Sequence, residues 1–228
     1  MTRQDYLSLL SGPRLANKET NGSSLALTLW MGAAQVAADI AVVAHGNAST
    51  PYFVSGSISP GVSTGIDDAS LGPRTFRGRR LTDADGTLAG ILASAIPSGS
   101  HERVCERDDI YFVARNGLEN HVEIRSPRLS YEQARAAKRR ILRIHSVMAP
   151  KPVHAFVGIA YRPSAETDEY EWRSTRRFLD RGNEVKVAPD FWNYVGASAD
   201  VYDQLVACCL EVVAYRQPEL RRLLLDAK

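Results

Sequence analysis

Residues 108–133 read DDIYFVARNGLENHVEIRSPRLSYEQ, and this stretch decides the fold. Two short runs rich in β-branched and aromatic residues, about 109–114 and 120–126, flank a turn that contains Asn116-Gly117. This pattern predicts a β-hairpin. The first predicted strand begins with Asp109, and the second contains Glu123 and Arg125. The stretch therefore predicts both a hairpin and a charged site on it.

Two registers of this hairpin are possible, and the residues favour one. A two-residue turn at Asn116-Gly117 places Asp109 opposite Ile124, whereas a three-residue loop with Gly117 left-handed in a G1 bulge places Asp109 opposite Glu123. Only the second register separates apolar from polar side chains. Its apolar face holds Ile110, Phe112, Val122 and Ile124, and its polar face holds Asp109, Tyr111, His121, Glu123 and Arg125. Because one face must be buried, we predict the second register.

The residues after the hairpin predict a helix and then a buried strand. Ser126-Pro127 ends the second strand, and Ser130 to Gln133 has the pattern of a capping box. The helix, 131–148, is expected to bury Ala134, Ala137, Ile141, Ile144 and Met148 and to expose Arg135, Arg139 and Arg143. Residues 153–161 are apolar almost throughout, as in a strand covered on both faces. Strand, helix and strand then form a parallel crossover.

The rest of the chain predicts an α/β protein with a mixed central sheet flanked by helices. We expect a long helix at 24–43, a loop-rich region at 46–80 with a short strand at 52–54, and a strand at 184–188. Further helices are expected at 5–10, 82–96, 190–195, 199–214 and 218–227. We expect one domain over residues 1–228. Its helical and loop part covers about 1–100, its core, which contains the hairpin, about 101–165 and its C-terminal helical part about 184–228.

Composition excludes several classes of protein. Apolar content of 44% and charged content of 24% are ordinary for a globular domain, and a net charge of +2 does not demand a polyanion. The three cysteines form neither a disulfide framework nor a zinc site, which favours a reducing cytoplasm. The start of the chain is polar, so we expect no signal peptide. The longest apolar stretch, Leu25 to His45, contains Gln35 and Asp39, so we expect no membrane span.

The polar face of the hairpin suggests metal-assisted chemistry on a phosphodiester. Two close carboxylates repel each other unless a cation neutralises them, and carboxylate oxygens suit Mg²⁺. Arg125 could stabilise negative charge on a pentavalent phosphorane, but a guanidinium cannot act as a general base. Activation of water would then fall to the metal. Acid–x–cation triplets are also common on the charged outer face of surface hairpins, and that interpretation stays open.

Arginine dominates the cations, since lysine occurs only at positions 18, 138, 151, 186 and 228. Arginine forms bidentate hydrogen bonds to phosphates and guanine edges better than lysine does, although codon bias in a GC-rich genome explains this usage equally well. Candidate DNA contacts, or else solvated surface, occur in the basic loop PRTFRGRR, at two positions of the helix predicted at 131–148 and in a segment rich in arginine and aromatic residues. The residues are Arg74, Arg77, Arg79, Arg80, Arg135, Arg139, Arg162 and Arg173.

Taken together, the hairpin acids, the acid–x–cation triplet, the helix and the buried strand resemble the core of the PD-(D/E)xK nuclease superfamily. More narrowly, EIRSPRLSYEQ at 123–133 is similar to the TdeIII-like type II restriction endonucleases, where we expect a stretch close to EIKSPKPNKGQ. A weaker likeness continues through AYRPSAETDEYEW at 160–172 and EVKVAPDFWNYVG at 184–196. It covers about residues 105–210 in all.

The resemblance implies a Mg²⁺-dependent type II restriction endonuclease. Such an enzyme is expected to cut double-stranded DNA at a short specific site as a homodimer, with a cognate methyltransferase in the same system. Asp109 and Glu123 would be metal ligands, with the Ile124 carbonyl as a third, and Gln133 matches a helix glutamine that serves either as cap or in the site. Arg125 stands where the family has a catalytic lysine. That departure leaves open a catalytically impaired DNA-binding protein, and an accidental hairpin would leave an unrelated α/β domain.

Overall fold

The computed structural model describes residues 22–59, 62–63, 66, 75–76, 79–80, 102–127, 129–161, 177–211 and 214. The helices are α2 (Gly22–His45), α5 (Tyr131–Met148) and α7 (Pro189–Gly196), and residues 201–211 are helical as well. The strands are β1 (Tyr52–Ile58), β2 (Thr75–Phe76), β3 (Arg79–Arg80), β4 (Glu102–Asp108), β5 (Ile110–Val113), β6 (Glu119–Arg125), β7 (Val153–Ile159) and β8 (Val185–Val187). The helices expected at 5–10, 82–96 and 218–227 lie outside the described residues.

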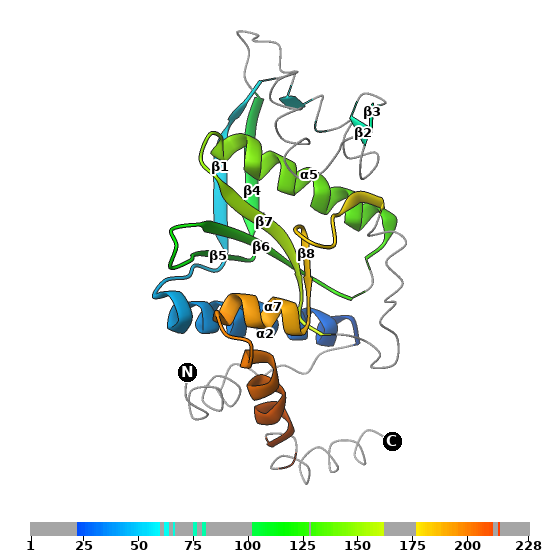
Figure 1. Cartoon of the computed structure of the whole chain (residues 1–228). Helices are drawn as coiled ribbons and strands as arrows, with labels where there is room; N and C mark the ends of the chain where they lie inside the picture. Colours follow the sequence, from blue (N-terminus) through cyan, green and yellow to red (C-terminus); the bar gives the residue numbers. More distant parts are fainter. Residues whose placement is uncertain are drawn as a thin grey trace.

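A mixed four-stranded sheet with the order β5-β6-β7-β8 is the centre of the fold. Strand β5 runs antiparallel to β6, while β7 and β8 run parallel to β6. The parallel crossover from β6 through α5 to β7 is present as predicted. Figure 1 shows α5 on one side of this sheet and α2 and α7 on the other. The predicted α/β class, a mixed sheet flanked by helices, is therefore confirmed.

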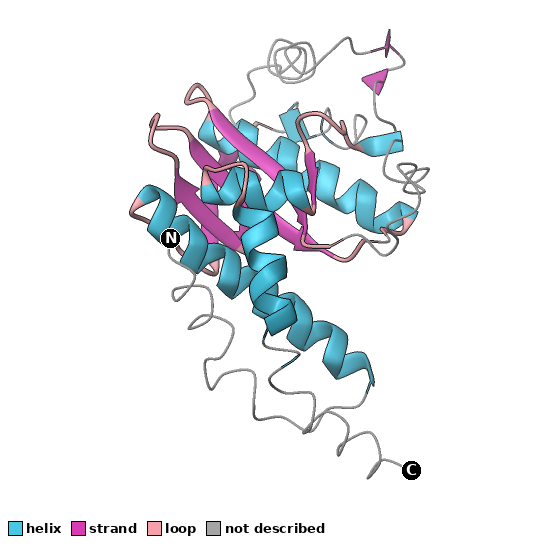
Figure 2. Cartoon of the chain, turned by 60° about the horizontal axis from the view of Figure 1, so that its bottom comes forward, coloured by secondary structure: helices cyan, strands magenta, loops and turns pink. Residues whose placement is uncertain are grey.

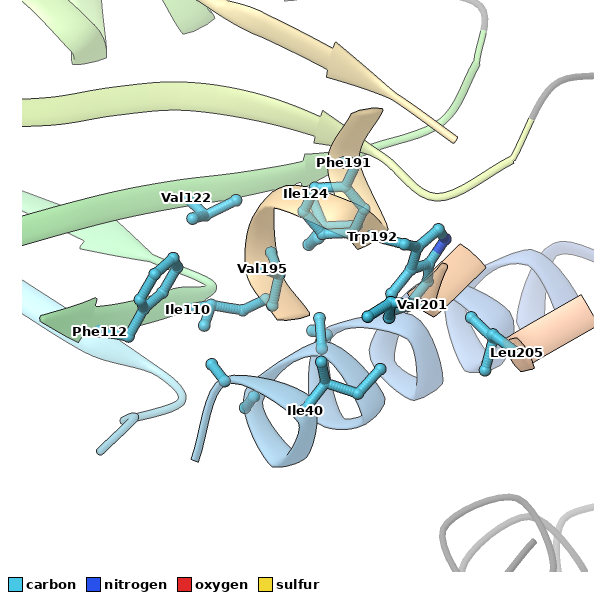
Figure 3. Packing of buried hydrophobic residues seen from close by; sticks show 14 of the residues in the cluster. Ile40, Ile110, Phe112, Val122, Ile124, Phe191, Trp192, Val195, Val201 and Leu205 are labelled. Atoms are coloured by element: carbon cyan, nitrogen blue, oxygen red, sulfur yellow. The ribbon is translucent and has the colours of Figure 1, made fainter. Parts of the chain in front are cut away.

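The two faces of the sheet bury separate apolar clusters. On the side of α2 and α7, the apolar face of the hairpin packs against alanines of α2 and against Phe191, Trp192 and Val195 of α7. Figure 3 shows this packing, and in Figure 2 the helices of this layer lie across the strands. On the other side, Ala134, Ala137, Ile141 and Ile144 of α5 cover β7. These four residues match the predicted buried stripe, and Met148 is half-buried against the same cluster.

A second ladder, β1 with β4, differs from the sequence prediction. The short strand expected at 52–54 extends to Ile58, and it pairs antiparallel with β4, for which no strand was predicted. The β4 sequence ERVCERD is mostly charged, because only two of its side chains, Val104 and Asp108, are buried. The ladder packs against α5 closely enough that a Cβ on Gly56 would lie 2.4 Å from Val147 Cγ1. This packing brings the end of β4 beside α5 and β6.

Candidate active site

The hairpin adopts the predicted register. Ile110 pairs with Val122 and Tyr111 with His121, which makes Asp109 and Glu123 the next residues along the two chains. Ala114 N donates to Leu118 O at 2.9 Å, so the loop consists of residues 115–117. Gly117 closes the turn with φ +83°, a left-handed conformation that glycine adopts without strain. The turn chemistry of the sequence therefore fixes the positions of both acids.

Asp109 lies at a local irregularity where β5 begins. Its amide donates to Val122 O at 2.9 Å, and its Oδ2 accepts from Ile124 N at 2.8 Å. The carboxylate thus bonds an amide of β6 that points to the β5 side, as the amides and carbonyls of alternate residues do. The side chain is buried, with 7% exposed, and burial raises the pKa of its carboxyl. The Ile124 amide and three arginines, Arg140, Arg125 and Arg107, oppose that rise.

Glu123 is buried between two arginines. Its Oε1 pairs with Arg125 Nη2, and its Oε2 lies 2.8 Å from Arg140 Nη1. The residue is 3% exposed, and neither carboxylate oxygen receives a hydrogen bond of good geometry within the described part of the chain. Burial of a charge is costly unless it is paired. The charge is therefore compensated by ion pairs, while the oxygen lone pairs are incompletely used.

We refer to Asp109, Glu123, Arg125 and Arg140 as the acid–arginine cluster. Arg140 was not identified from the sequence, which singled out Arg139 and Arg143 instead. It pairs with Glu123, donates to the carbonyl of Arg107 through Nη2, and has its Nε 3.7 Å from Glu106 Oε2. One signal could have found it. Arg140 lies three residues after the buried Ala137 and four before the buried Ile144, so it borders the apolar stripe, where an arginine requires an acidic partner.

Asp108 and His121 form a second buried polar pair beside the cluster. His121 Nδ1 lies 2.7 Å from Asp108 Oδ2, and both side chains are about 1% exposed or less. The rings of Tyr111 and Tyr52 pack near the imidazole, with ring centroids 5.2 and 6.1 Å away. Sequence analysis assigned His121 no role beyond its place on the polar face of the hairpin. This face of the hairpin is thus buried under α5 and the β1–β4 ladder, which argues against a charged surface hairpin.

Gln133 has the capping contacts that the sequence predicts, whereas the arginines of α5 are less exposed than predicted. Gln133 completes the capping box, since its backbone N–H donates to Ser130 Oγ at 3.2 Å and its side-chain Oε1 accepts from Ser130 N at 2.9 Å. The expectation that α5 exposes Arg135, Arg139 and Arg143 as a stripe is wrong, because all three are half-buried. The β1–β4 ladder packs against the C-terminal half of α5, where Leu142 joins the cluster of Ile58 and Val104 and Arg143 pairs with Glu106 at 3.1 Å.

The other candidate DNA contacts are largely untested. Arg135 lies 3.9 Å from Glu132, one turn earlier in α5. The backbones of Arg79 and Arg80 form β3, which pairs with β2, and their side chains lie outside the described part of the structure. Arg74, Arg77, Arg162 and Arg173 lie outside the described residues. Roles of these residues in DNA binding therefore stay predictions.

The donor set of the cluster fits Mg²⁺ better than a metal that needs nitrogen or sulfur ligands. Asp109 and Glu123 supply carboxylate oxygens, and those of Glu123 are buried without hydrogen bonds. Within the described ranges, no group of three or more His, Cys, Asp or Glu side chains could hold a metal ion. Mg²⁺ is commonly held by one or two carboxylates together with substrate phosphate and water. Two acids are therefore sufficient for that ion.

Comparison with known proteins gives an independent line of evidence. The family model of HinfI type II restriction endonucleases matches residues 33–213. The type II restriction enzyme HgiCII of Herpetosiphon aurantiacus is 27% identical over 189 residues, which make up 82% of this chain and 68% of that enzyme. HgiBI and HgiEI of the same organism are each 30% identical over 142 residues, covering 61% of this chain but 48% of each enzyme. No solved structure matches the chain.

The match to the family model includes the whole acid–arginine cluster, because Asp109 to Arg140 lie well inside residues 33–213. The narrower resemblance to TdeIII-like enzymes stays a prediction. Since the chain spans about half the length of two of the curated relatives, their substrates are not transferred to it directly. Among the helices that the structure describes, none is long and apolar enough to cross a membrane.

Proposed function

Because the chain belongs to the HinfI family of type II restriction endonucleases, we propose that it hydrolyses phosphodiester bonds of double-stranded DNA at a short specific site and requires Mg²⁺. Membership agrees with the enzyme class predicted from the sequence, a type II site-specific deoxyribonuclease. The observation that carries the proposal is the placement of Asp109 and Glu123 at one end of the hairpin, buried together with two arginines.

Each member of the site has a distinct task in the proposed reaction. The carboxylates of Asp109 and Glu123, with the carbonyl of Ile124, would hold the cation through oxygen atoms. Bound Mg²⁺ would supply a more acidic water and neutralise phosphoryl charge. In the hydrolysis itself, a water oxygen forms a bond to phosphorus and gives up one proton to solvent, while the bond from phosphorus to the leaving sugar oxygen breaks and that oxygen gains a proton from solvent. Arg125 stabilises the phosphorane as a fixed positive charge, because it cannot transfer a proton.

The second candidate function is a catalytically impaired DNA-binding protein on the same fold. Two features favour it. Arg125 replaces the lysine expected at this position, and its guanidinium already pairs with Glu123. A metal must compete with that ion pair for the carboxylate. The two candidates differ in whether DNA is cut, not in whether it is bound.

The proposal includes the partners expected of this class. Two identical sites in a homodimer would cut the two antiparallel strands, and a two-fold axis matches a palindromic sequence. Arg135 and Arg139 of α5, together with the basic loop at 73–80 and Arg162 and Arg173, are proposed phosphate contacts. A cognate methyltransferase in the same system would protect the host DNA.

The test is cleavage of plasmid or phage DNA with Mg²⁺, with Ca²⁺ and with EDTA. Discrete bands with Mg²⁺ alone are expected, and Glu123→Gln should abolish them while a gel shift in Ca²⁺ persists. Glu132→Gln is the matched control, because Glu132 is a carboxylate on the surface of α5 with 75% of its side chain exposed. A gel shift without cutting by the wild type would select the impaired binder. Absence of both would reject both candidates.

A further inference from the structure

Arg140 and Arg125 both contact the carboxylate of Glu123, but they differ in their other partners and in how exposed they are. Arg140 also binds the backbone carbonyl of Arg107 and lies 3.7 Å from Glu106, and 18% of its side chain is exposed. Arg125 has 33% of its side chain exposed, and its buried Nε has no hydrogen-bond partner among the described residues. Arg140 is therefore held by one hydrogen bond and by ion pairs with two glutamates, while Arg125 retains an unused donor.

The contacts of Arg140 connect the elements that carry the two acids. Glu123 belongs to β6, whereas Arg107 is in β4, two residues before Asp109. Arg140 itself comes from α5, the helix that covers this face of the sheet. A single guanidinium thus holds the side chain of one acid and the backbone that leads into the other. The planar fork of arginine suits such simultaneous contacts, which a lysine cannot reproduce.

We propose that Arg140 is a positioning residue of the active site, which holds Glu123 and the chain leading to Asp109 in the geometry needed for catalysis and compensates the charge of Glu123. This assigns the role of facing DNA phosphate to Arg125, whose donors are not all engaged. The catalytic part of this inference rests on the proposed function. Its structural part, energetic coupling between Arg140 and Glu123, does not.

Charge compensation explains why two buried carboxylates can coexist before a metal binds. In their ionised forms, Asp109 and Glu123 carry two negative charges, and Arg125 and Arg140 carry two positive ones. Removing one member of a buried pair leaves an uncompensated charge, which is strongly destabilising. Removing both members together leaves no such charge. The proposal therefore predicts that the effects of losing Arg140 and of losing the Glu123 charge on thermal stability are not additive.

The experiment is a double-mutant cycle on thermal stability with Arg140→Met, Glu123→Gln and the double variant. Arg140→Met should lower Tm by roughly 5–10 °C, and adding Glu123→Gln should recover at least half of that loss. Arg143→Met is the matched control. Arg143 occupies the next turn of α5 and pairs with Glu106, but it makes no ion pair with Glu123. Its cycle with Glu123→Gln should be additive within about 1–2 °C.

Kinetics complete the test. Arg140→Met should lower kcat for cleavage roughly 10²-fold with KM for DNA changed less than about threefold, since misplacement of a catalytic group acts on the chemical step. Arg140→Lys should recover part of the stability and little of kcat. Additive stability effects of Arg140→Met and Glu123→Gln would overturn the inference, as would equal kcat losses in the Arg140 and Arg143 variants. If the wild type cuts no DNA, the proposed function fails, while the cycle still decides whether Arg140 holds Glu123.

Discussion

The carboxylate of Asp109 accepts a hydrogen bond from the backbone amide of Ile124, with 2.8 Å between Oδ2 and N. Ile124 directly follows Glu123 in β6, so the first acid of the site is held by the strand that carries the second. The contact exists because the three-residue loop at 115–117 sets the register and the backbone is irregular at Asp109. Local turn chemistry therefore controls the distance between two groups that are separated by a whole hairpin.

Substitutions of Asp109 should separate its structural role from its catalytic one. Asp109→Asn loses the charge that the arginines compensate but keeps an oxygen that can accept from the Ile124 amide, so the free energy of unfolding should fall less than in Asp109→Ala. Asp109→Ala leaves that buried amide without this acceptor and should cost about 1–3 kcal/mol. Both should lose DNA cleavage, because neither supplies the charged ligand. Urea unfolding and plasmid cleavage measure the two effects. Cleavage by Asp109→Asn at the wild-type rate would remove Asp109 from the site.

Gly158 in β7 tests how the sheet supports the site from the other face. It pairs with Ile124 in the parallel ladder, and a Cβ built there would lie 2.5 Å from Cε2 of Phe191 in α7. Gly158→Ala should therefore force α7 away from the sheet and lower the free energy of unfolding by about 1–3 kcal/mol. Gly182→Ala is the control, since its nearest neighbour, Asp180 Oδ1, is at an ordinary 3.5 Å. Similar stabilities of the two variants in urea would show that α7 packs less closely than the structure indicates.

The hairpin could be predicted from sequence because its determinants are local. The glycine at 117 selects the loop, and alternation of apolar and polar residues selects the register, as the structure bears out. The capping box at Ser130 is predictable for the same reason, since its partners lie within three residues. Position of the two acids on one hairpin thus follows from interactions over a short stretch of chain.

Arg140 and β4 were missed because their roles depend on distant partners. β4 has two buried side chains, and its partner β1 lies about fifty residues earlier, so no local period marks it as a strand. Arg140 was passed over because an arginine next to Arg139 reads as part of a solvated face. Only the packing of α5 against β4 and β6 turns it toward Glu123.

His145 should make stability depend on pH. Burial, helped by His154, Lys138 and His121, lowers the pKa of His145 from 6.5 to about 4. Between those values the unfolded chain binds more protons than the folded one, so stability is retained above pH 6.5 and falls as pH drops toward 4. The loss should approach about 3 kcal/mol. His145→Gln should flatten this slope in urea unfolding at pH 4.5 and 7, and an unchanged slope would assign it to other groups.

Arg125 separates the active enzyme from the impaired binder. In an active nuclease its guanidinium serves as a fixed positive charge, so Arg125→Ala should lower the cleavage rate by about 10²–10³-fold, as for loss of one transition-state donor. Arg125→Lys keeps the charge and restores the residue expected at this position, and it should be tolerated. Single-turnover cleavage with saturating Mg²⁺ measures the chemical step.

In an impaired protein the same variants should behave differently. The wild type would then bind DNA in a gel shift but cut it with no divalent metal, because the Arg125 guanidinium keeps its ion pair with Glu123. Arg125→Lys would restore cutting. The compact ammonium of lysine cannot reproduce the contacts of the planar guanidinium, so it should compete less well with Mg²⁺ for the carboxylate of Glu123. Arg140 stays in place in both cases and supplies the remaining compensation for Glu123. Wild-type cleavage that is unaffected by Arg125→Ala would contradict both versions and would transfer the catalytic cation to another residue of the chain.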